Sequence, residues 1–160
     1  MAHARLGSRE QARTDLERSS ELLPTAVAMN ELGKIALHAG DTAAARQYFQ
    51  AAASGQGEVS QQARQAFVRL DIGENPGTYI QSRPFLESGG RLFAQLRNAT
   101  QLDLQNVVVD FGAVTVDGTA RQTRVLRILP AGASVNVDSG IVLQDARQQV
   151  QVRIREAQVR

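Results

Sequence analysis

The segment MNELGKIALHAGDTAAARQYFQAA, from Met29 to Ala52, decides the fold that we expect for the first half of the chain. Apolar residues recur at helical spacing on both sides of Gly40-Asp41, a pair that ends one helix and begins the next. Two helices joined by so short a turn pack side by side, and their backbones approach closely only where small residues meet. We therefore expect Gly33 and Ala45 at the crossing point, with larger residues such as Phe49 filling the space beside it.

This segment resembles the tetratricopeptide repeat, whose pattern reads W-x2-L-G-x2-Y, then A-x3-F, then P. Leu32-Gly33 stand in the L-G place, and Ala45 and Phe49 stand in the A-x3-F place. Met29 and Ala36 replace the two aromatic residues. The resemblance implies helical hairpins that stack on one another, because one hairpin cannot bury its whole apolar face. It also implies that the chain binds other proteins or peptides.

Residues 1–24 resemble the tail of an earlier repeat. Ala12 and Leu16 stand where the Ala and Phe of the A-x3-F place stand one unit later, and Pro24 fills the final Pro place. Half a repeat leaves an apolar face uncovered, so we expect further repeats upstream in a longer parent chain, or self-association through this open face. The helical segment 1–72 is thus expected to comprise a partial repeat over 1–24, a complete repeat over 25–57 and a capping helix over 58–72.

The pattern changes at Gly73-Glu74-Asn75-Pro76-Gly77, where two glycines and a proline predict a turn or hinge. Beyond it apolar and polar residues alternate, as in Val150-Gln151-Val152-Arg153-Ile154, which is typical of strands with one exposed face. Asp117-Gly118 predicts a hairpin turn. Pro84 cannot donate to a central ladder, so its strand is expected at a sheet edge. About six or seven short strands are expected, within 79–86, 91–97, 107–111, 114–116, 122–129, 135–138 and 150–155.

These strands predict a β-sandwich over residues 78–160. The segment also resembles the FxLYD-type immunoglobulin-like domains of bacterial envelope proteins, through Gln95–Thr100, Leu104–Val109 and Leu129–Gly132. The FxLYD string itself is missing, and Asp110-Phe111 is its nearest counterpart. The expected fold class is therefore α+β in two parts, with tetratricopeptide helical hairpins followed by an all-β immunoglobulin-like sandwich. The two resemblances imply a periplasmic or outer-membrane-associated protein of the bacterial envelope, such as a lipoprotein, with a cytoplasmic location as the alternative.

Composition narrows the function further. The chain has 18 Lys and Arg, 16 Asp and Glu and no Cys, and aromatic residues make up only 4% of it. Thiol catalysis, thiolate metal sites and disulfides are therefore excluded. Neither half has a basic block interleaved with aromatic rings, so we expect no nucleic-acid partner. The lack of Cys suits the periplasm and the cytoplasm equally, and it leaves the compartment undecided.

Catalytic and cofactor motifs are missing from the sequence. His3 and His38 have no second ligand at helical spacing, and no phosphate-binding glycine loop or nucleophile elbow occurs. The sequon Asn98-Ala99-Thr100 falls at a strand end, where we interpret it as a turn rather than a glycosylation site. We therefore expect a chain that is not an enzyme and that binds no cofactor and no metal.

The candidate site is the concave face that the first helices of tetratricopeptide arrays line. Asn30 and Lys34 are one helical turn apart, so an amide and an ammonium would share this face and could hold a peptide carboxylate or backbone. The residues expected to bind a partner there are Val27, Asn30, Lys34, Leu37, His38 and Arg64. The alternative interpretation is an ordinary solvated helix face with one cation.

The predicted function is a non-enzymatic interaction or scaffolding module that binds a protein or peptide. Two alternatives remain open at this point. The chain could be the non-catalytic, substrate-presenting tail of a larger envelope enzyme such as a protease. It could also be a structural part of an oligomer, with the open repeat face within 1–24 buried against a second copy.

Overall fold

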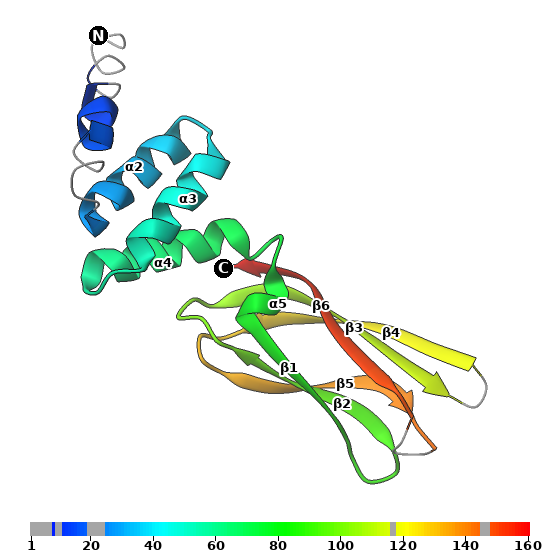
Figure 1. Cartoon of the computed structure of the whole chain (residues 1–160). Coiled ribbons are helices and arrows are strands. Elements are labelled where there is room, and N and C mark those ends of the chain that lie inside the picture. Colours follow the sequence, from blue (N-terminus) through cyan, green and yellow to red (C-terminus); the bar gives the residue numbers. More distant parts are fainter. Residues whose placement is uncertain (1–7, 9–10, 19–24, 116–117, 145–147) are drawn as a thin grey trace. The chain divides into compact units, whose positions relative to one another are not determined.

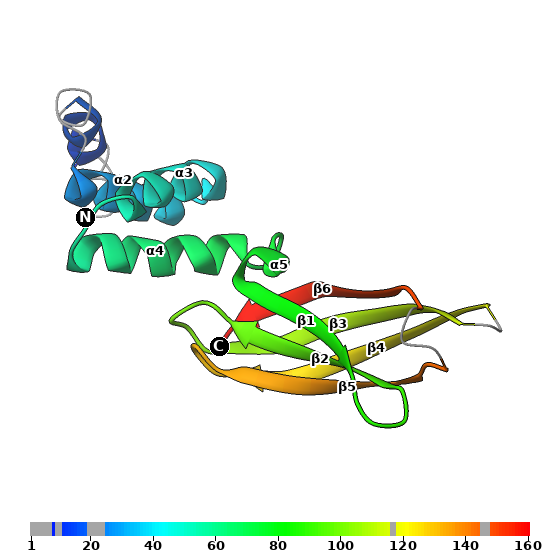
Figure 2. The same ribbon diagram turned by 60° about the horizontal axis from the view of Figure 1, so that its bottom comes forward.

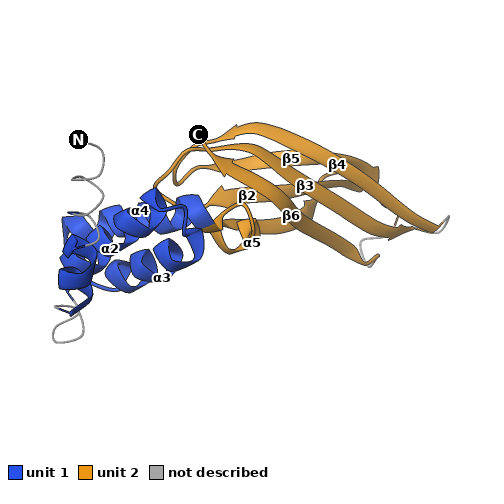
Figure 3. Ribbon diagram, turned by 90° about the horizontal axis from the view of Figure 1, so that it is seen from above, with its two compact units in different colours: residues 1–70 blue, residues 71–160 orange. Residues whose placement is uncertain are grey.

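The structure is a computed structural model of the chain, and it describes residues 8, 11–18, 25–115, 118–144 and 148–160. The chain divides into two compact units, Met1–Leu70 and Asp71–Arg160 (Figure 3). The first unit is helical, and the second consists of strands preceded by one short helix. The fold is therefore mixed α+β, and the expected order of helices first and strands afterwards is confirmed.

Two helices of the first unit, α2 and α3, begin directly after side chains that cap them. Thr25 precedes α2, and its hydroxyl oxygen accepts a hydrogen bond from the Ala28 amide at 3.2 Å. Asp41 precedes α3, and its carboxylate accepts from the Ala44 amide at 2.9 Å. Such caps satisfy amide groups that the first turn of a helix leaves without a partner. The helices of this unit are residues 11–18, α2 (Ala26–His38), α3 (Thr42–Ala53) and α4 (Glu58–Asp71), the last of which ends at the first residue of the second unit (Figure 1).

Gly33 of α2 lies directly against the ring of Phe49 in α3. A β-carbon placed on Gly33 would be 2.7 Å from two ring carbons of Phe49, which is closer than such atoms pack. Ala45 is completely buried and belongs to the same apolar cluster as Phe49. The small residues predicted at the crossing therefore lie at a close approach of two helices, and α2 and α3 form the expected hairpin. The buried residues of the cluster are Ala36, Ala45, Phe49, Ala52 and Ala63.

Residues 11–18 are helical, within the segment predicted to be a partial repeat. Ala12 is exposed there, whereas Ala45, its counterpart in the hairpin, is buried. The hydroxyl of Tyr48 donates to Oε1 of Glu17 at 3.5 Å, so this helix contacts α3. The other residues of the predicted partial repeat, except Ser8, lie outside the described residues, and His3 and Pro24 are among them.

The second unit contains two antiparallel three-stranded sheets in the part of the chain that the structure describes (Figure 2). One sheet has the strand order β1-β2-β5 and the other β4-β3-β6. A short helix, α5 (Pro76–Tyr79), precedes the first strand. The strands are β1 (Ile80–Leu86), β2 (Arg91–Asn98), β3 (Leu104–Thr115), β4 (Gly118–Leu129), β5 (Ser134–Val142) and β6 (Val150–Val159).

Strand β3 combines two of the predicted strands and carries a local irregularity. Asn106 has a φ of 52°, in the left-handed region that Asn tolerates better than most residues. Three consecutive valines, Val107–Val109, are buried directly after it, and the register with β6 shifts over the same residues. At its other end β3 pairs with β4 up to Thr115 and Gly118, which gives the predicted hairpin. Asp117, predicted in its turn, lies outside the described residues.

Pro84 lies in an edge strand, as the sequence predicted. The amide of Ala99 donates to the Tyr79 carbonyl and the amide of Glu87 donates to the Arg91 carbonyl, each at 2.9 Å. Antiparallel strands alternate between residues that bond to the neighbour and residues that point away from it. The backbone nitrogen and carbonyl of residue 84 therefore point away from β2, toward the open edge of the sheet. The missing N–H of Pro84 costs no ladder hydrogen bond, and it interrupts an edge that could otherwise pair with another chain.

Asn98 joins the end of β2 to two later segments through a buried side chain. Its Nδ2 donates toward the carbonyl oxygens of Leu102, Leu129 and Pro130, at 2.8, 3.1 and 3.1 Å. Its Oδ1 accepts from the amide and the hydroxyl of Thr100, at 2.9 and 2.8 Å. The side chain is therefore committed to the fold and is 0% exposed, which is incompatible with a glycan on its amide nitrogen and agrees with the turn interpretation of the sequon.

Candidate functional site

Helix α2 exposes apolar side chains near both of its ends. Val27 is 56% exposed and Leu37 is 43% exposed. Lys34 lies between these two residues along the helix. Val27, Lys34 and His38 are seven and four residues apart, and these spacings place them on one face of the helix. Four of the six residues predicted to bind a partner, Val27, Lys34, Leu37 and His38, are therefore exposed on α2.

The charged residues on this face, Lys34 and Glu31, form an ion pair. Nζ of Lys34 lies 2.7 Å from Oε1 of Glu31, and both side chains are about half exposed. An ion pair in such a position contributes little to stability, because water competes for both groups. It therefore presents a cation and a carboxylate side by side, each of which a partner can still reach.

His38 is held in place by its own helix. Its Nδ1 is 2.8 Å from the carbonyl oxygen of Lys34. A carbonyl can only accept, so Nδ1 donates in this contact to a carbonyl in the last turns of α2. This leaves Nε2 as the ring nitrogen that a partner could contact.

Asn30 does not lie where the prediction placed it. Asn30 is only 3% exposed, so its side-chain amide does not lie beside the Lys34 ammonium on an open face. The physical reason is its position three residues before Gly33, because positions three apart lie on neighbouring parts of a helix surface and Gly33 faces α3. Asn30 therefore belongs to the buried side of α2, and a peptide cannot reach its amide while the hairpin is intact.

Arg64 of α4 is exposed, but its guanidinium group is used within the helical unit. Its Nη2 donates to the Gly55 carbonyl at 3.1 Å, and its Nε donates to the Ser60 carbonyl at 3.3 Å. Gly55 lies just beyond the end of α3, so Arg64 links α4 to the turn between the two helices. These contacts give Arg64 a structural role within the helical unit, and they do not support its predicted role in binding a partner.

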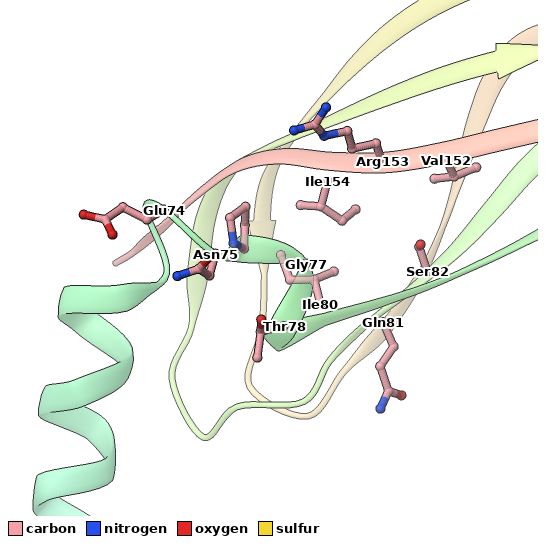
Figure 4. A pocket seen from close by; sticks show the side chains of 11 residues that line it. Glu74, Asn75, Gly77, Thr78, Ile80, Gln81, Ser82, Val152, Arg153 and Ile154 are labelled. Atoms are coloured by element: carbon pink, nitrogen blue, oxygen red, sulfur yellow. The ribbon is translucent and has the colours of Figure 1, made fainter. Parts of the chain in front are cut away.

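A cavity of about 450 Å³ opens in the second unit beside α5, between β1 and β6 (Figure 4). Ile80 and Ile154 lie in its middle, while the guanidinium group of Arg153 and the carboxylate of Glu74 point away from it. Acid–base catalysis needs titratable groups that converge on one point. The side chains that line this cavity do not converge in that way, so we do not assign chemistry to it.

One surface of the second unit was missed by our sequence analysis. The outer face of β1-β2-β5 carries two exposed arginines, Arg83 and Arg97, next to the stacked rings of Phe85 and Phe93. The signal was present in the sequence, because Gln81-x-Arg83-x-Phe85 and Phe93-x-Gln95-x-Arg97 each place a Gln, an Arg and a Phe at alternate positions, with Phe at the end of one and the start of the other. Only antiparallel pairing in the observed register makes the two patterns meet, and the sequence does not specify that register.

Among the described residues, His, Cys, Asp and Glu side chains form no group of three that could hold a metal ion. No helix in that part of the chain is both long and apolar enough to cross a membrane. Comparisons with protein-family models, with curated proteins and with solved structures found no match to this chain.

Proposed function

We propose that this chain is a non-enzymatic protein-interaction module, in which a tetratricopeptide-like helical hairpin presents α2 to a partner. The observation that carries the proposal is the exposed face of α2, where Val27 and Leu37 accompany the Lys34–Glu31 pair. Apolar side chains contribute most of the binding energy when they leave water, about 25 cal/mol per Å² of buried apolar surface. The adjacent charges would orient the bound segment, because exposed ion pairs favour specificity more than affinity.

The repeat assignment is part of this proposal and is supported by local geometry. The close contact of Gly33 with Phe49 and the buried Ala45 are the features that the repeat pattern requires of a hairpin. For the second unit we propose an immunoglobulin-like β-sandwich. Two antiparallel sheets with buried apolar residues on β2 and β3 support that architecture. The bacterial envelope, periplasmic or outer-membrane-associated, remains our proposed location on the strength of these resemblances.

A photo-crosslinking amino acid at position 37 tests the proposed surface directly. In a lysate of the source organism, we expect a defined crosslinked protein with Leu37 replaced, and none with exposed Gln62 of α4 replaced. The captured protein, once purified, should bind the chain with an affinity that Val27→Asp and Lys34→Glu each reduce about tenfold, or about 1.4 kcal/mol. Equal crosslinking at positions 37 and 62, or unchanged affinity of both variants, would overturn the assignment of α2 as the binding face.

A further inference from the structure

The outer face of the β1-β2-β5 sheet places three rows of side chains in register. Opposite residues of antiparallel strands share a face, so each row crosses the three strands. The middle row holds the amides of Gln95 and Asn136 beside Arg83 and borders a shallow cavity of about 320 Å³. The three rows, each from β1 to β5, are Gln81–Arg97–Ser134, Arg83–Gln95–Asn136 and Phe85–Phe93–Asp138.

Two arginines are close neighbours on this face. Arg83 lies opposite Gln95, and Arg97 lies two residues further along β2. Arg83 and Arg97 are therefore diagonal neighbours, and the Cα atoms of such neighbours are about 7 Å apart. Both are exposed, and neither forms an ion pair with any residue that the structure describes. Like charges at such a separation repel each other, only weakly because both side chains are exposed to water. A carboxylate bound between the two arginines would remove this repulsion. Its two oxygens would also match the fork of N–H donors on a guanidinium group.

The opposite end of the face carries two aromatic rings beside one ion pair. The rings of Phe85 and Phe93 stack with a centroid separation of 5.6 Å and an interplanar angle of 22°. Asp138, in the same row, is engaged by Arg91 at 3.4 Å, so the acidic group nearest the rings is already paired. The face therefore changes across the three rows from two rows that each hold an unpaired arginine among polar side chains to a row with two half-buried aromatic rings.

The outer face of the other sheet lacks this arrangement. Asp110 accepts a hydrogen bond from Thr123 at 2.7 Å and lies 3.6 Å from a guanidinium nitrogen of Arg155. Exposed Arg121 and Arg127 are both on β4, but they are six positions apart and so cannot grip one small anion together. The adjacent, unpaired arginines beside an aromatic pair thus distinguish the β1-β2-β5 face.

We infer that the outer face of β1-β2-β5 is a second docking surface, which takes an extended acidic segment of a protein partner. Side chains on one face of an extended chain recur every second residue, about 7 Å apart, which matches the spacing of Arg83 and Arg97. The segment would carry carboxylates at two alternate positions and an apolar residue two positions further on, over Phe85 and Phe93. The inference rests on the proposed function, because it assumes that the chain binds proteins, but it concerns a different unit.

Charge complementarity favours a peptide over a nucleic acid as the occupant. Single-stranded nucleic acids need a groove of positive charge along several phosphates and rings open for base stacking. Here two cations stand together, and the two phenyl rings already stack on each other. The amides of Gln95 and Asn136, in the same row as Arg83, suit the backbone groups of an extended peptide.

Fluorescence anisotropy with a labelled peptide tests this surface on the full chain. The probe carries Glu at two alternate positions followed by Leu at the next alternate position, and an oligonucleotide of equal charge is measured in parallel. We expect Arg83→Gln plus Arg97→Gln to weaken peptide binding at least tenfold, while the melting temperature stays the same or rises. The matched control, Arg121→Gln plus Arg127→Gln, removes the same charge from β4 and should bind like the unmodified chain.

Each of three results would overturn the inference. These are undetectable peptide binding, equal losses in the two double variants, and tighter binding of the oligonucleotide than of the peptide. The variant Val27→Asp separates this surface from α2, because it should lower affinity for the partner of α2 and leave the acidic peptide unaffected. If Val27→Asp instead abolishes peptide binding, the peptide binds α2 and the second surface is wrong, while the proposed function survives.

Discussion

Gly33 and Phe49 are in direct contact, and a single methyl group on Gly33 would overlap the aromatic ring. The ring of Phe49 is itself buried in an apolar cluster, so it has little room to move away. This contact brings α2 and α3 together and fixes which face of α2 remains exposed. The candidate binding face thus depends on a residue that does not belong to it.

Gly33→Ala is expected to destabilise the helical unit by about 1–3 kcal/mol, the usual cost of overpacking a filled core. Chemical denaturation followed by far-UV circular dichroism measures the effect. The control is Gly77→Ala, because nothing lies within 4 Å of a β-carbon at that position. It should change stability by no more than about 0.5 kcal/mol. Equal stability of the two variants would mean that the helices do not approach as described.

Gly140 and Arg124 make a similar contact between strands of different sheets. Nε of Arg124 on β4 donates to the Asp138 carbonyl on β5 at 3.1 Å, and its guanidinium group occupies the space of a β-carbon at Gly140. The arginine side chain is flexible and can move aside, so Gly140→Ala should cost the about 1–2 kcal/mol of left-handed backbone strain plus about 1 kcal/mol for the Arg124–Asp138 hydrogen bond that is lost. Gly132→Ala is the matched control, since Gly132 has a similar φ of 69° and open space around it.

A double-mutant cycle identifies the origin of any difference between these two variants. Adding Arg124→Ala to Gly140→Ala removes the overlapping group, so we expect the extra loss to disappear and only backbone strain to remain. Thermal denaturation of the four proteins provides the measurement. Strictly additive losses would show that Arg124 does not contact Gly140.

Asn98→Ala should destabilise the second unit by about 2–4 kcal/mol, because it leaves several buried polar groups without a hydrogen-bond partner. The matched control is Asn136→Ala, whose side chain is exposed on β5. Urea denaturation measures both. Expression in a host that glycosylates secreted proteins should add no mass at Asn98, and a glycan there would contradict its buried position.

Pro84→Thr should make the chain more prone to self-association, because it restores an N–H group on the open edge of β1. Light scattering at increasing protein concentration should show aggregation at lower concentration than for the unmodified chain. Pro130→Ala serves as the control, since Pro130 is exposed outside the strands. Unchanged or reduced scattering for Pro84→Thr would argue that this edge is covered by something other than the proline.

The helical hairpin could be predicted from the sequence because its determinants are local. Thr25 and Asp41 cap helices by accepting hydrogen bonds from amides three residues later in the chain. Gly33 is a small residue at a position where a known hairpin pattern requires one. Pro84 is similar, because a missing N–H group restricts where its strand can lie. In each case the residue type itself carries the constraint, whatever the rest of the chain does.

The tertiary structure decided which side chains remain available to a partner. Asn30 and Lys34 share a helical turn, yet the proximity of Asn30 to Gly33 buries one residue while the other stays exposed. Arg83 and Arg97 are far from conspicuous in the sequence, and the register of β1 with β2 alone makes them neighbours. Helix formation depends on neighbours along the chain, whereas exposure and strand register depend on segments that the sequence brings together only through the complete fold.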